Sequence, residues 1–249
     1  MSIEQTGFGK IELFEDFCGP EWIIAETAAT GALGAFRVIG DGVGTNTDSG
    51  VVILESDALA GIAQLTTTDE ASHCTGLATA KCFDVALMGT LTMEVRVRLA
   101  DLDTKSIFLG FCDENDDAET AICVGATTTV TLTASDLCGF LFDHSFTGVC
   151  EDDWHMVFNG GTTTGETDGT AIDADKPAVA GEFDILRVEI DPNGTARWYV
   201  NGVLKQTKAG AVSTTTDLAA VVLLQADGAA IETADLDYIL VTANRDWTV

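Results

Sequence analysis

Hydrophobic and polar residues alternate with a period of two along much of this chain. The clearest run is Leu91–Leu99, in which every odd-numbered residue is apolar and every even-numbered residue is Thr, Glu or Arg. Side chains in a β-strand point alternately to opposite faces, so this pattern predicts a strand with one buried face. The same period recurs often enough to indicate a protein built mainly of strands.

Three alternating runs follow one another between Phe183 and Thr207. Asp191–Gly194 separates the first two runs, and Asn201-Gly202 separates the second from the third. Asn-Gly is favoured in a two-residue type I′ hairpin because both central residues need a positive φ. The segment therefore predicts a three-stranded antiparallel meander, which we interpret as scaffold.

Further runs with strand character occur on both sides of this meander. They are Ile11–Phe17, Ala35–Ile39, Gly50–Leu54, Gly61–Thr66, Ser106–Phe111, Leu137–Phe142, Asp153–Phe158, Leu218–Leu224 and Leu236–Thr242. A loop rich in Asp and Thr separates Ser106–Phe111 from Leu137–Phe142, and we expect Asn159–Pro177 to be a flexible tract. Amphipathic helical patterns are scarce. The chain is predicted to be all-β, with two packed antiparallel sheets.

The domain organisation follows from the few helix breakers and linkers. The 249 residues include three prolines and no Ser/Pro-rich linker, and 46% are hydrophobic, which is ample for a large core. We expect a single sandwich domain over residues 11–249. Residues 1–10 show little pattern and are expected to form an N-terminal arm.

The charge of the chain restricts its partners. Twelve basic and 40 acidic residues give a net charge of −28. A nucleic-acid binder needs a basic surface, and anionic membranes repel a strongly acidic protein, so neither partner is expected. The start of the chain lacks the basic and apolar regions of a signal peptide, and we expect synthesis in a cytosol.

Two segments resemble ligand-binding loops only in part. Asp113–Asp117 places oxygen ligands at alternate positions, as calcium loops do, but the glycine at the sixth position is missing and Val124 stands where the bidentate Glu would be. We interpret it as a solvated acidic turn. Gly40–Gly44 has the glycines of a phosphate loop without the following Lys-Ser/Thr, and it is predicted to be a turn.

Cysteine and histidine are the remaining candidates for metal ligands. Two groups have residue types that suit a zinc site or a Cys–His pair: His73, Cys74 and Cys82, and His144, Cys150 and His155. Neither group contains the closely spaced pairs of a zinc site, and none of the seven cysteines forms CxxC. We therefore expect chance adjacency, reduced cysteines that mostly pack in the core, no metal and no cofactor.

Carboxylates and aromatic residues are the remaining candidates for carbohydrate chemistry. Jelly-roll glycosidases carry E-x-D-x-x-E on one strand; Glu189-Ile190-Asp191 begins that pattern, but Gly194 stands at its last place. Glu232, Asp235 and Asp237 do not fit it either. No catalytic residue is expected. Trp154 and Trp198 have inward-facing parity, whereas Tyr199 and Trp247 are freer to stack on a sugar, and Trp22 has no clear assignment.

The order of several segments resembles a known group of domains. The segments are Phe14–Phe17, Gly139–Asp143 followed by Trp154-His155, Arg187–Asp191, Trp198–Gly202 and Leu236–Val241. Together they resemble the concanavalin A-like (LamG-like) jelly-roll domains of tailed bacteriophages. This resemblance implies a jelly-roll sandwich and a structural role in the virion, where such domains decorate or cement the capsid. Its motifs are fold motifs, so they support the architecture more directly than the role.

The expected function is accordingly that of a non-enzymatic virion protein. The resemblance implies a capsid decoration or cement protein on the outside of a phage head, which binds the major capsid protein and forms a homo-oligomer, with a trimer favoured. The alternative is a glycan-binding, lectin-like module on a virion. A third reading is a divergent glycoside hydrolase.

Overall fold

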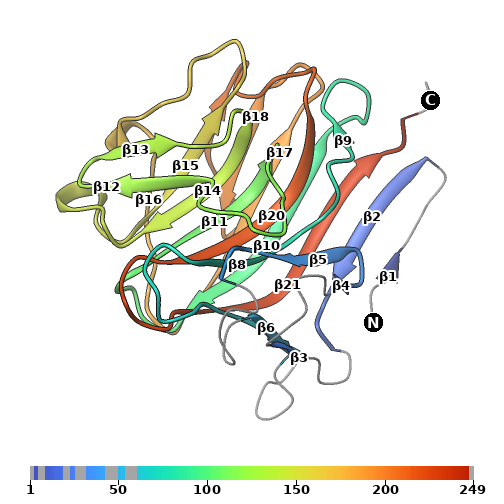
Figure 1. The fold of residues 1–249 in the computed structure, drawn as a ribbon. Helices are drawn as coiled ribbons and strands as arrows, with labels where there is room; N and C mark the ends of the chain where they lie inside the picture. Colours follow the sequence, from blue (N-terminus) through green and yellow to red (C-terminus); the bar gives the residue numbers. More distant parts are fainter. Residues whose placement is uncertain are drawn as a thin grey trace.

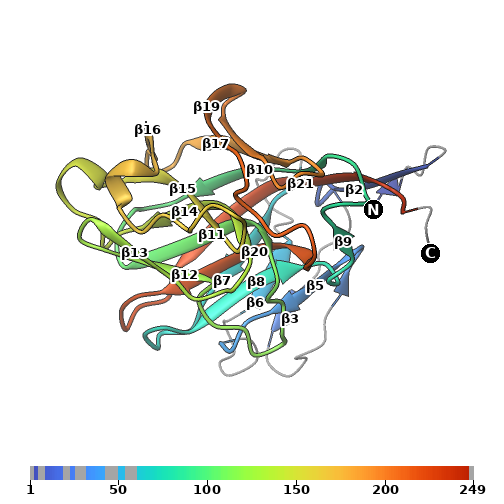
Figure 2. The same ribbon diagram turned by 90° about the horizontal axis from the view of Figure 1, so that it is seen from above.

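The computed structural model describes residues 3–4, 9–18, 23–25, 32–42, 50–53 and 61–246. Their strands form two large sheets that stack face to face (Figure 1, Figure 2). All pairings between the named strands are antiparallel. The predicted all-β, two-sheet antiparallel sandwich is confirmed. Among the described residues, no helix is long and apolar enough to span a membrane.

The first sheet, sheet A, has β10 and β21 at its centre. Its order is β19 (Val203–Lys208), β18 (Ala196–Val200), β17 (Phe183–Ile190), β10 (Leu91–Leu99), β21 (Thr233–Asn244), β7 (Ala63–Thr66), β6 (Gly50–Ile53) and β3 (Ile23–Ala25). In addition, β2 (Lys10–Glu15) pairs with the last part of β21, and β1 (Ile3–Glu4) pairs with β2.

The second sheet, sheet B, has β11 and β20 at its centre. Its order is β16 (Asp173–Pro177), β15 (Asp153–Asn159), β14 (Leu137–Asp143), β11 (Lys105–Cys112), β20 (Asp217–Ala226), β8 (Cys74–Ala78), β5 (Phe36–Ile39) and β4 (Ala32–Leu33). A short strand, β9 (Phe83–Asp84), pairs with the start of β20. The remaining elements are the hairpin of β12 (Cys123–Ala126) and β13 (Thr129–Leu132) and two 3-10 turns, η1 (Gly148–Cys150) and η2 (Gly169–Ala171).

The alternation in the sequence sets which residues enter the core. Along β10, buried and half-buried residues alternate without exception, as predicted. Val95 lies opposite Leu186 of β17 and Ile239 of β21, and all three side chains are buried. Apolar residues from both sheets form one hydrophobic core between the layers.

The predicted meander is present as β17, β18 and β19. Asn201 and Gly202 join the last two strands with φ values of 50° and 79°, as a type I′ hairpin requires. Two other strands are longer than the apolar runs that predicted them: Leu218–Leu224 lies within β20, and Leu236–Thr242 lies within β21. Their extra residues are polar or small, and pairing with neighbouring strands holds them extended.

Two expected loops contain regular structure instead. The Asp- and Thr-rich loop after β11 contains the β12–β13 hairpin, and the tract expected to be flexible, Asn159–Pro177, contains η2 and β16. The sequence did not reveal these elements because each strand is short, at four or five residues, and lacks a long run of alternating apolar and polar residues. The expected N-terminal arm also contributes to sheet A, since Ile3 and Glu4 pair with Phe14 and Leu13. Residues 5–8 lie outside the described part.

Candidate functional site

The outer face of sheet B is buried over its central strands. Phe108 of β11 lies beside Leu141 of β14 and Leu223 of β20, and each is at most 3% exposed although it points away from sheet A. In the β12–β13 hairpin, β12 packs against β14 and β11 (Figure 2). Val130 of the hairpin belongs to the hydrophobic core, and so does Ile122, just before β12. Within the described part of the chain, this face is thus buried along β14, β11 and β20, and the hairpin covers β14 and β11.

One carboxylate faces this covered region from the end of β14. Asp143 is buried and accepts hydrogen bonds from the backbone N–H groups of Gly125 (2.7 Å) and Ser145 (2.8 Å). Burial raises its pKa above the ordinary value. In the spacing E-x-D-x-x-E, Asp143 takes the middle place and the apolar Leu141 and Phe146 take the places of both glutamates. The sequence did not suggest Asp143, because apolar residues stand at the two glutamate positions around it.

Glu189 and Asp191, the first two positions of that pattern in the meander, lie on the outer side of sheet A. Two guanidinium nitrogens of Arg197 bind Asp191 Oδ2 at 2.8 and 2.7 Å. Glu189 accepts a hydrogen bond from the Tyr199 hydroxyl (3.1 Å) and lies 3.4 Å from Arg187 Nε. Both carboxylates therefore lie beside arginine side chains, an arrangement that suits a surface ion-pair network.

The other acidic residues singled out from the sequence are paired in the same way. The pairs are Glu232 with Lys105, Asp235 with Arg98, and Asp237 with Arg96. Lys105 is fully buried and also binds Asp101 at 2.8 Å. Ion pairing with a basic side chain explains the position of each of these three carboxylates. The expectation that the chain has no catalytic residue stays a prediction.

The first His–Cys group does not come together. Cys74 of β8 pairs with Gln225, whereas the backbone of Cys82 bonds to Leu218 near the other end of β20. Seven residues of extended strand separate those contacts by about 23 Å. His73 instead contacts the Thr68 hydroxyl through Nδ1, at 3.0 Å.

The second group divides into two clusters. His144 joins Asp143 and Asp227, and its Nδ1 lies 3.0 Å from Asp227 Oδ2. Burial, reinforced by the nearby charge of Asp143, raises the pKa of Asp227 to about 6. Cys150 and His155 come together with Asp173, which the sequence did not suggest because it lies 18 residues beyond His155. Strand pairing between β15 and β16 supplies that third residue.

The predicted acidic turn, Asp113–Asp117, is a structured loop rather than a fully solvated one. Asn115 is buried and donates to the Thr79 carbonyl (2.8 Å), while Arg37 binds Asp117 at 2.6 Å. The loop bonds to the backbone of Gly40, in the predicted turn Gly40–Gly44. Gly40 has a φ of 121°, and a Cβ there would lie 2.2 Å from the Cys74 carbonyl, so its glycine serves close packing. Residues 43–44 lie outside the described part.

The aromatic residues follow the predicted division where they are described. Trp154 and Trp198 are buried, as predicted, and Trp198 donates its indole N–H to the Gly139 carbonyl (2.8 Å). Tyr199 is half-buried and lies under the guanidinium of Arg187, 4.2 Å from the ring centroid. Trp22 and Trp247 lie outside the described residues.

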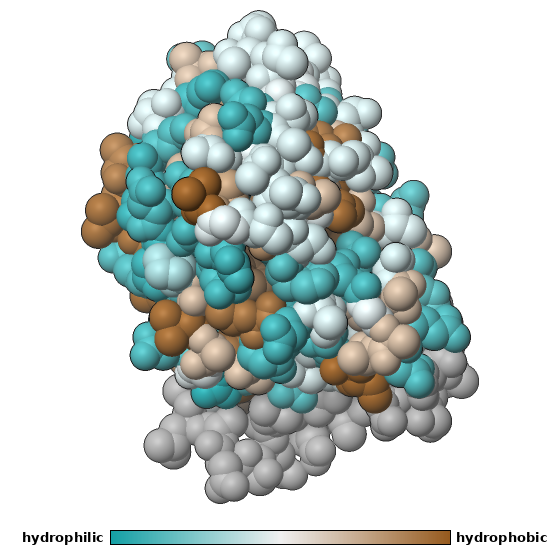
Figure 3. Space-filling view, turned by 90° about the vertical axis from the view of Figure 1, so that its left-hand side faces the viewer, coloured by the Kyte–Doolittle hydropathy of each residue, from teal (hydrophilic) through white to brown (hydrophobic). Residues whose placement is uncertain are grey.

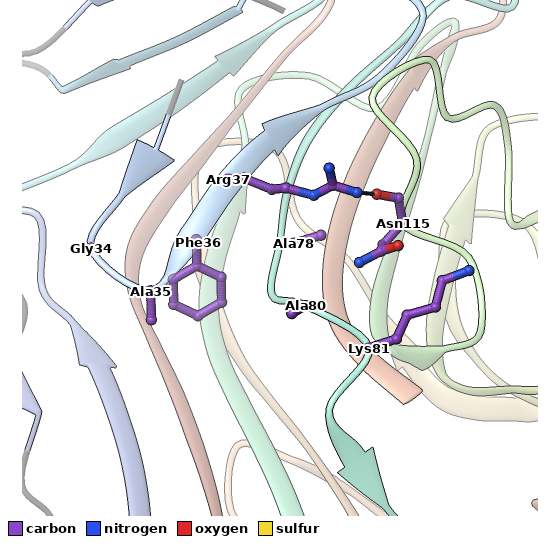
Figure 4. A pocket seen from close by; sticks show the side chains of 8 residues that line it. All are labelled: Gly34, Ala35, Phe36, Arg37, Ala78, Ala80, Lys81 and Asn115. Carbon is purple, nitrogen blue, oxygen red and sulfur yellow. Dashed lines mark hydrogen bonds between the residues drawn. The ribbon is translucent and has the colours of Figure 1, made fainter. Parts of the chain in front are cut away.

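A pocket of about 500 Å³ lies beside β5 (Figure 4). Small residues, including Ala78 and Ala80, line it together with Phe36 and Lys81, and Arg37 extends toward Asn115. Arg37 and Lys81 are two of only 12 basic residues in the chain. Elsewhere, on the face shown in Figure 3, apolar residues form small separate patches between polar ones.

Neither a protein-family model nor a curated protein sequence matches the chain. Solved structures do match it at the level of the fold. A protein of unknown function from Shewanella oneidensis MR-1 aligns with a TM-score of 0.59 and 10% identity, over 99% of this chain and 92% of that one.

Two further matches define the type of sandwich. Peanut lectin aligns with a TM-score of 0.57 and 13% identity, over 94% of this chain and 97% of the lectin. Bacillus licheniformis β-glucanase aligns with a TM-score of 0.51 and 14% identity, over 97% of this chain and all of the enzyme. The fold is a concanavalin A-like jelly roll, which hosts both lectins and glycoside hydrolases, so the fold by itself does not assign an activity.

Proposed function

We propose that this chain is a non-enzymatic virion structural protein that decorates the outside of a phage head. The observation that carries the non-enzymatic part is the filled outer face of sheet B. Apolar residues and the β12–β13 hairpin occupy it, and Leu141 and Phe146 stand where the E-x-D-x-x-E spacing around Asp143 would need glutamates. A glycosidase needs a carboxyl pair beside an open substrate site.

The virion part rests on the resemblance of the ordered strand motifs to jelly-roll domains of tailed phages. Charge supports an exterior position, because a net charge of −28 is repelled by packaged DNA. In this proposal the chain is made in the host cytoplasm, binds the major capsid protein and works as a homo-oligomer, with a trimer favoured. Self-association multiplies a weak contact with the shell through effective concentration.

Antibody labelling of virions tests this proposal. Antibodies against the purified chain should label intact particles before the genome is released. Labelling of opened particles alone, or its absence from virions, would refute the exterior position.

A second candidate function is glycan binding, favoured by the pocket beside β5. Its small-residue floor and the polar groups of Arg37, Asn115 and Lys81 suit a ligand rich in hydroxyl groups or carrying a negative charge. Several structural neighbours are lectins or carbohydrate recognition domains. Glycan-array binding that disappears in Arg37→Ala would favour this function over decoration alone. Uniformly negative arrays would exclude it for the glycans present.

A further inference from the structure

Three side chains of metal-binding type meet on the outer side of sheet B. Cys150 ends η1, His155 lies in β15 and Asp173 begins β16. One ligand atom from each lies within 4.8 Å of the other two. His155 and Asp173 are register partners in adjacent antiparallel strands, so their side chains leave the sheet on the same face.

The surroundings of the His155 imidazole indicate a site for a bound ligand. The residue is 0% exposed, and neither ring nitrogen has a hydrogen-bond partner among the residues that the structure describes. The backbone carbonyls of Asp153 and Leu141 lie near the ring without reaching hydrogen-bonding geometry. Buried polar groups almost always have a hydrogen-bond partner, so a buried imidazole without one needs an explanation. A metal ion bound to the ring would provide that explanation. Phe146 stacks on the ring at 3.8 Å and holds its plane.

The donor types in the cluster also suit a cation. A thiol, an imidazole and nearby carboxyl groups are the side chains that bind divalent transition metal ions in proteins. The carboxyl groups of Asp153 and Asp173 are neighbours, and among the described residues Asp153 Oδ1 is buried without a hydrogen-bond partner. Within the described residues neither carboxylate has an ion pair, since the nearby Lys176 binds Asp184.

We propose that Cys150, His155 and Asp173 bind a divalent transition metal ion. A thiolate, an imidazole and a carboxylate together favour Zn²⁺ among the common ions. Ligand atoms around tetrahedral zinc lie roughly 3.3–3.8 Å apart, so from separations of at most 4.8 Å the cluster needs to contract by no more than about 1.5 Å to bind the ion. The buried oxygen of Asp153 is the further donor that can complete or support this set.

A bound metal ion would hold together the segments from which its ligands come. Cys150 belongs to the segment between β14 and β15, and Asp173 follows η2, which packs against η1. A metal bridging them would fasten this segment to the edge of sheet B. The inference is independent of the proposed virion role.

Cobalt substitution of the full-length chain tests the site. Reduced, metal-stripped protein should bind one equivalent of Co²⁺ with a thiolate-to-metal absorption band and the visible bands of four-coordinate cobalt, and Zn²⁺ should displace it. Cys150→Ser should abolish the thiolate band, and Asp173→Asn should weaken binding at least about tenfold. Cys138→Ser is the matched control, because that cysteine is equally buried but lies outside the cluster.

Three results would overturn the inference. They are no saturable binding by the wild-type chain, a thiolate band that survives Cys150→Ser, and affinities unchanged by Asp173→Asn. If Cys150→Ser does not fold, alkylation of the wild-type protein tests the metal site instead. Zn²⁺ should slow modification of Cys150 in mild denaturant and leave Cys138 unaffected, and equal rates with and without zinc would count against the site.

Discussion

Trp154 donates its indole N–H to the carboxylate of Asp184 across the interior of the sandwich, at 3.0 Å. Trp154 belongs to sheet B and Asp184 to sheet A, so the bond ties the two layers together. Asp184 also accepts a hydrogen bond from Asn201 (2.8 Å) and lies 3.2 Å from Lys176 Nζ. A buried carboxylate is tolerated in this core because donors satisfy it from several sides.

Trp154→Phe should therefore destabilise the fold by about 1–3 kcal/mol, because the buried carboxylate loses a donor that water cannot replace. Urea unfolding measures this loss. Tyr199→Phe is the control: it removes a hydroxyl bound to Glu189 on the outer face and should cost less than about 1 kcal/mol. A similar loss from both substitutions would show that the hydrogen bond between the two sheets stabilises the fold no more than the one on the outer face.

The register of β10 predicts unequal effects from neighbouring residues. Val95→Asp places an unpaired charge in the core, at a position 1% exposed, and should cost at least about 3 kcal/mol. Glu94→Gln should cost little, because an amide oxygen can still accept the hydrogen bond from the Tyr238 hydroxyl. Equal losses in unfolding free energy would contradict the register.

The cysteines should divide into two groups by reactivity. Cys18 and Cys82 are exposed, and the other five are buried in the core. Alkylation followed by mass spectrometry should modify Cys18 and Cys82 in the native protein and the other five only after unfolding. Partial burial and the charge of Asp217 raise the pKa of the Cys82 thiol, so its modification should accelerate at alkaline pH. A disulfide in protein from its native source would refute the expectation of reduced cysteines.

Glycoside hydrolysis provides a direct test of the non-enzymatic reading. The chain should not cleave β-glucans, agars or carrageenans, because Glu189 and Asp191 are engaged by arginines and have no third carboxylate at the motif spacing. Reducing-sugar release provides the measurement. Turnover that disappears in Glu189→Gln would refute the proposed function.

Stability should depend on pH through Asp227. Its pKa of about 6, against an ordinary 3.8, reflects burial and the charges of Asp143 and Glu232, partly offset by His144. The folded state holds the proton more tightly, so this group makes stability fall as pH rises from about 4 to about 6. Asp227→Asn should remove that decline and gain stability relative to the wild type at pH 7.

Urea midpoints measured between pH 4 and pH 8 provide the comparison. Glu182→Gln, at an exposed position, is the control and should keep the wild-type profile. A constant difference between Asp227→Asn and the wild type across this range would show that Asp227 does not titrate as described.

Much of the fold was predictable because alternation is a local property. The register of β10, the meander with its Asn201-Gly202 turn and the burial of Trp154 and Trp198 all follow from which residues stand at even and odd positions. Strands that are apolar on both sides, such as β11 and β20, were recognisable as short apolar runs. The sequence did not reveal what covers their outer sides.

The candidate sites depended on pairing between distant segments. Cys150 and His155 are close in sequence, but Asp173 joins them only because β15 and β16 are register partners. Likewise Asp227 reaches His144 because β20 and β14 both flank β11. No local pattern encodes such neighbours, since strand order and register are set by the packing of the whole sandwich.

The sequence by itself determined the all-β class, the inward faces of the main strands and the acidic surface, because side-chain polarity and strand period act residue by residue. Only the tertiary structure decided that the outer face of sheet B is filled, that Glu189 and Asp191 are tied to arginines, and that an unpaired His155 lies beside a thiol and a carboxylate. The physical reason is that these features arise between residues that only long-range strand pairing brings into contact.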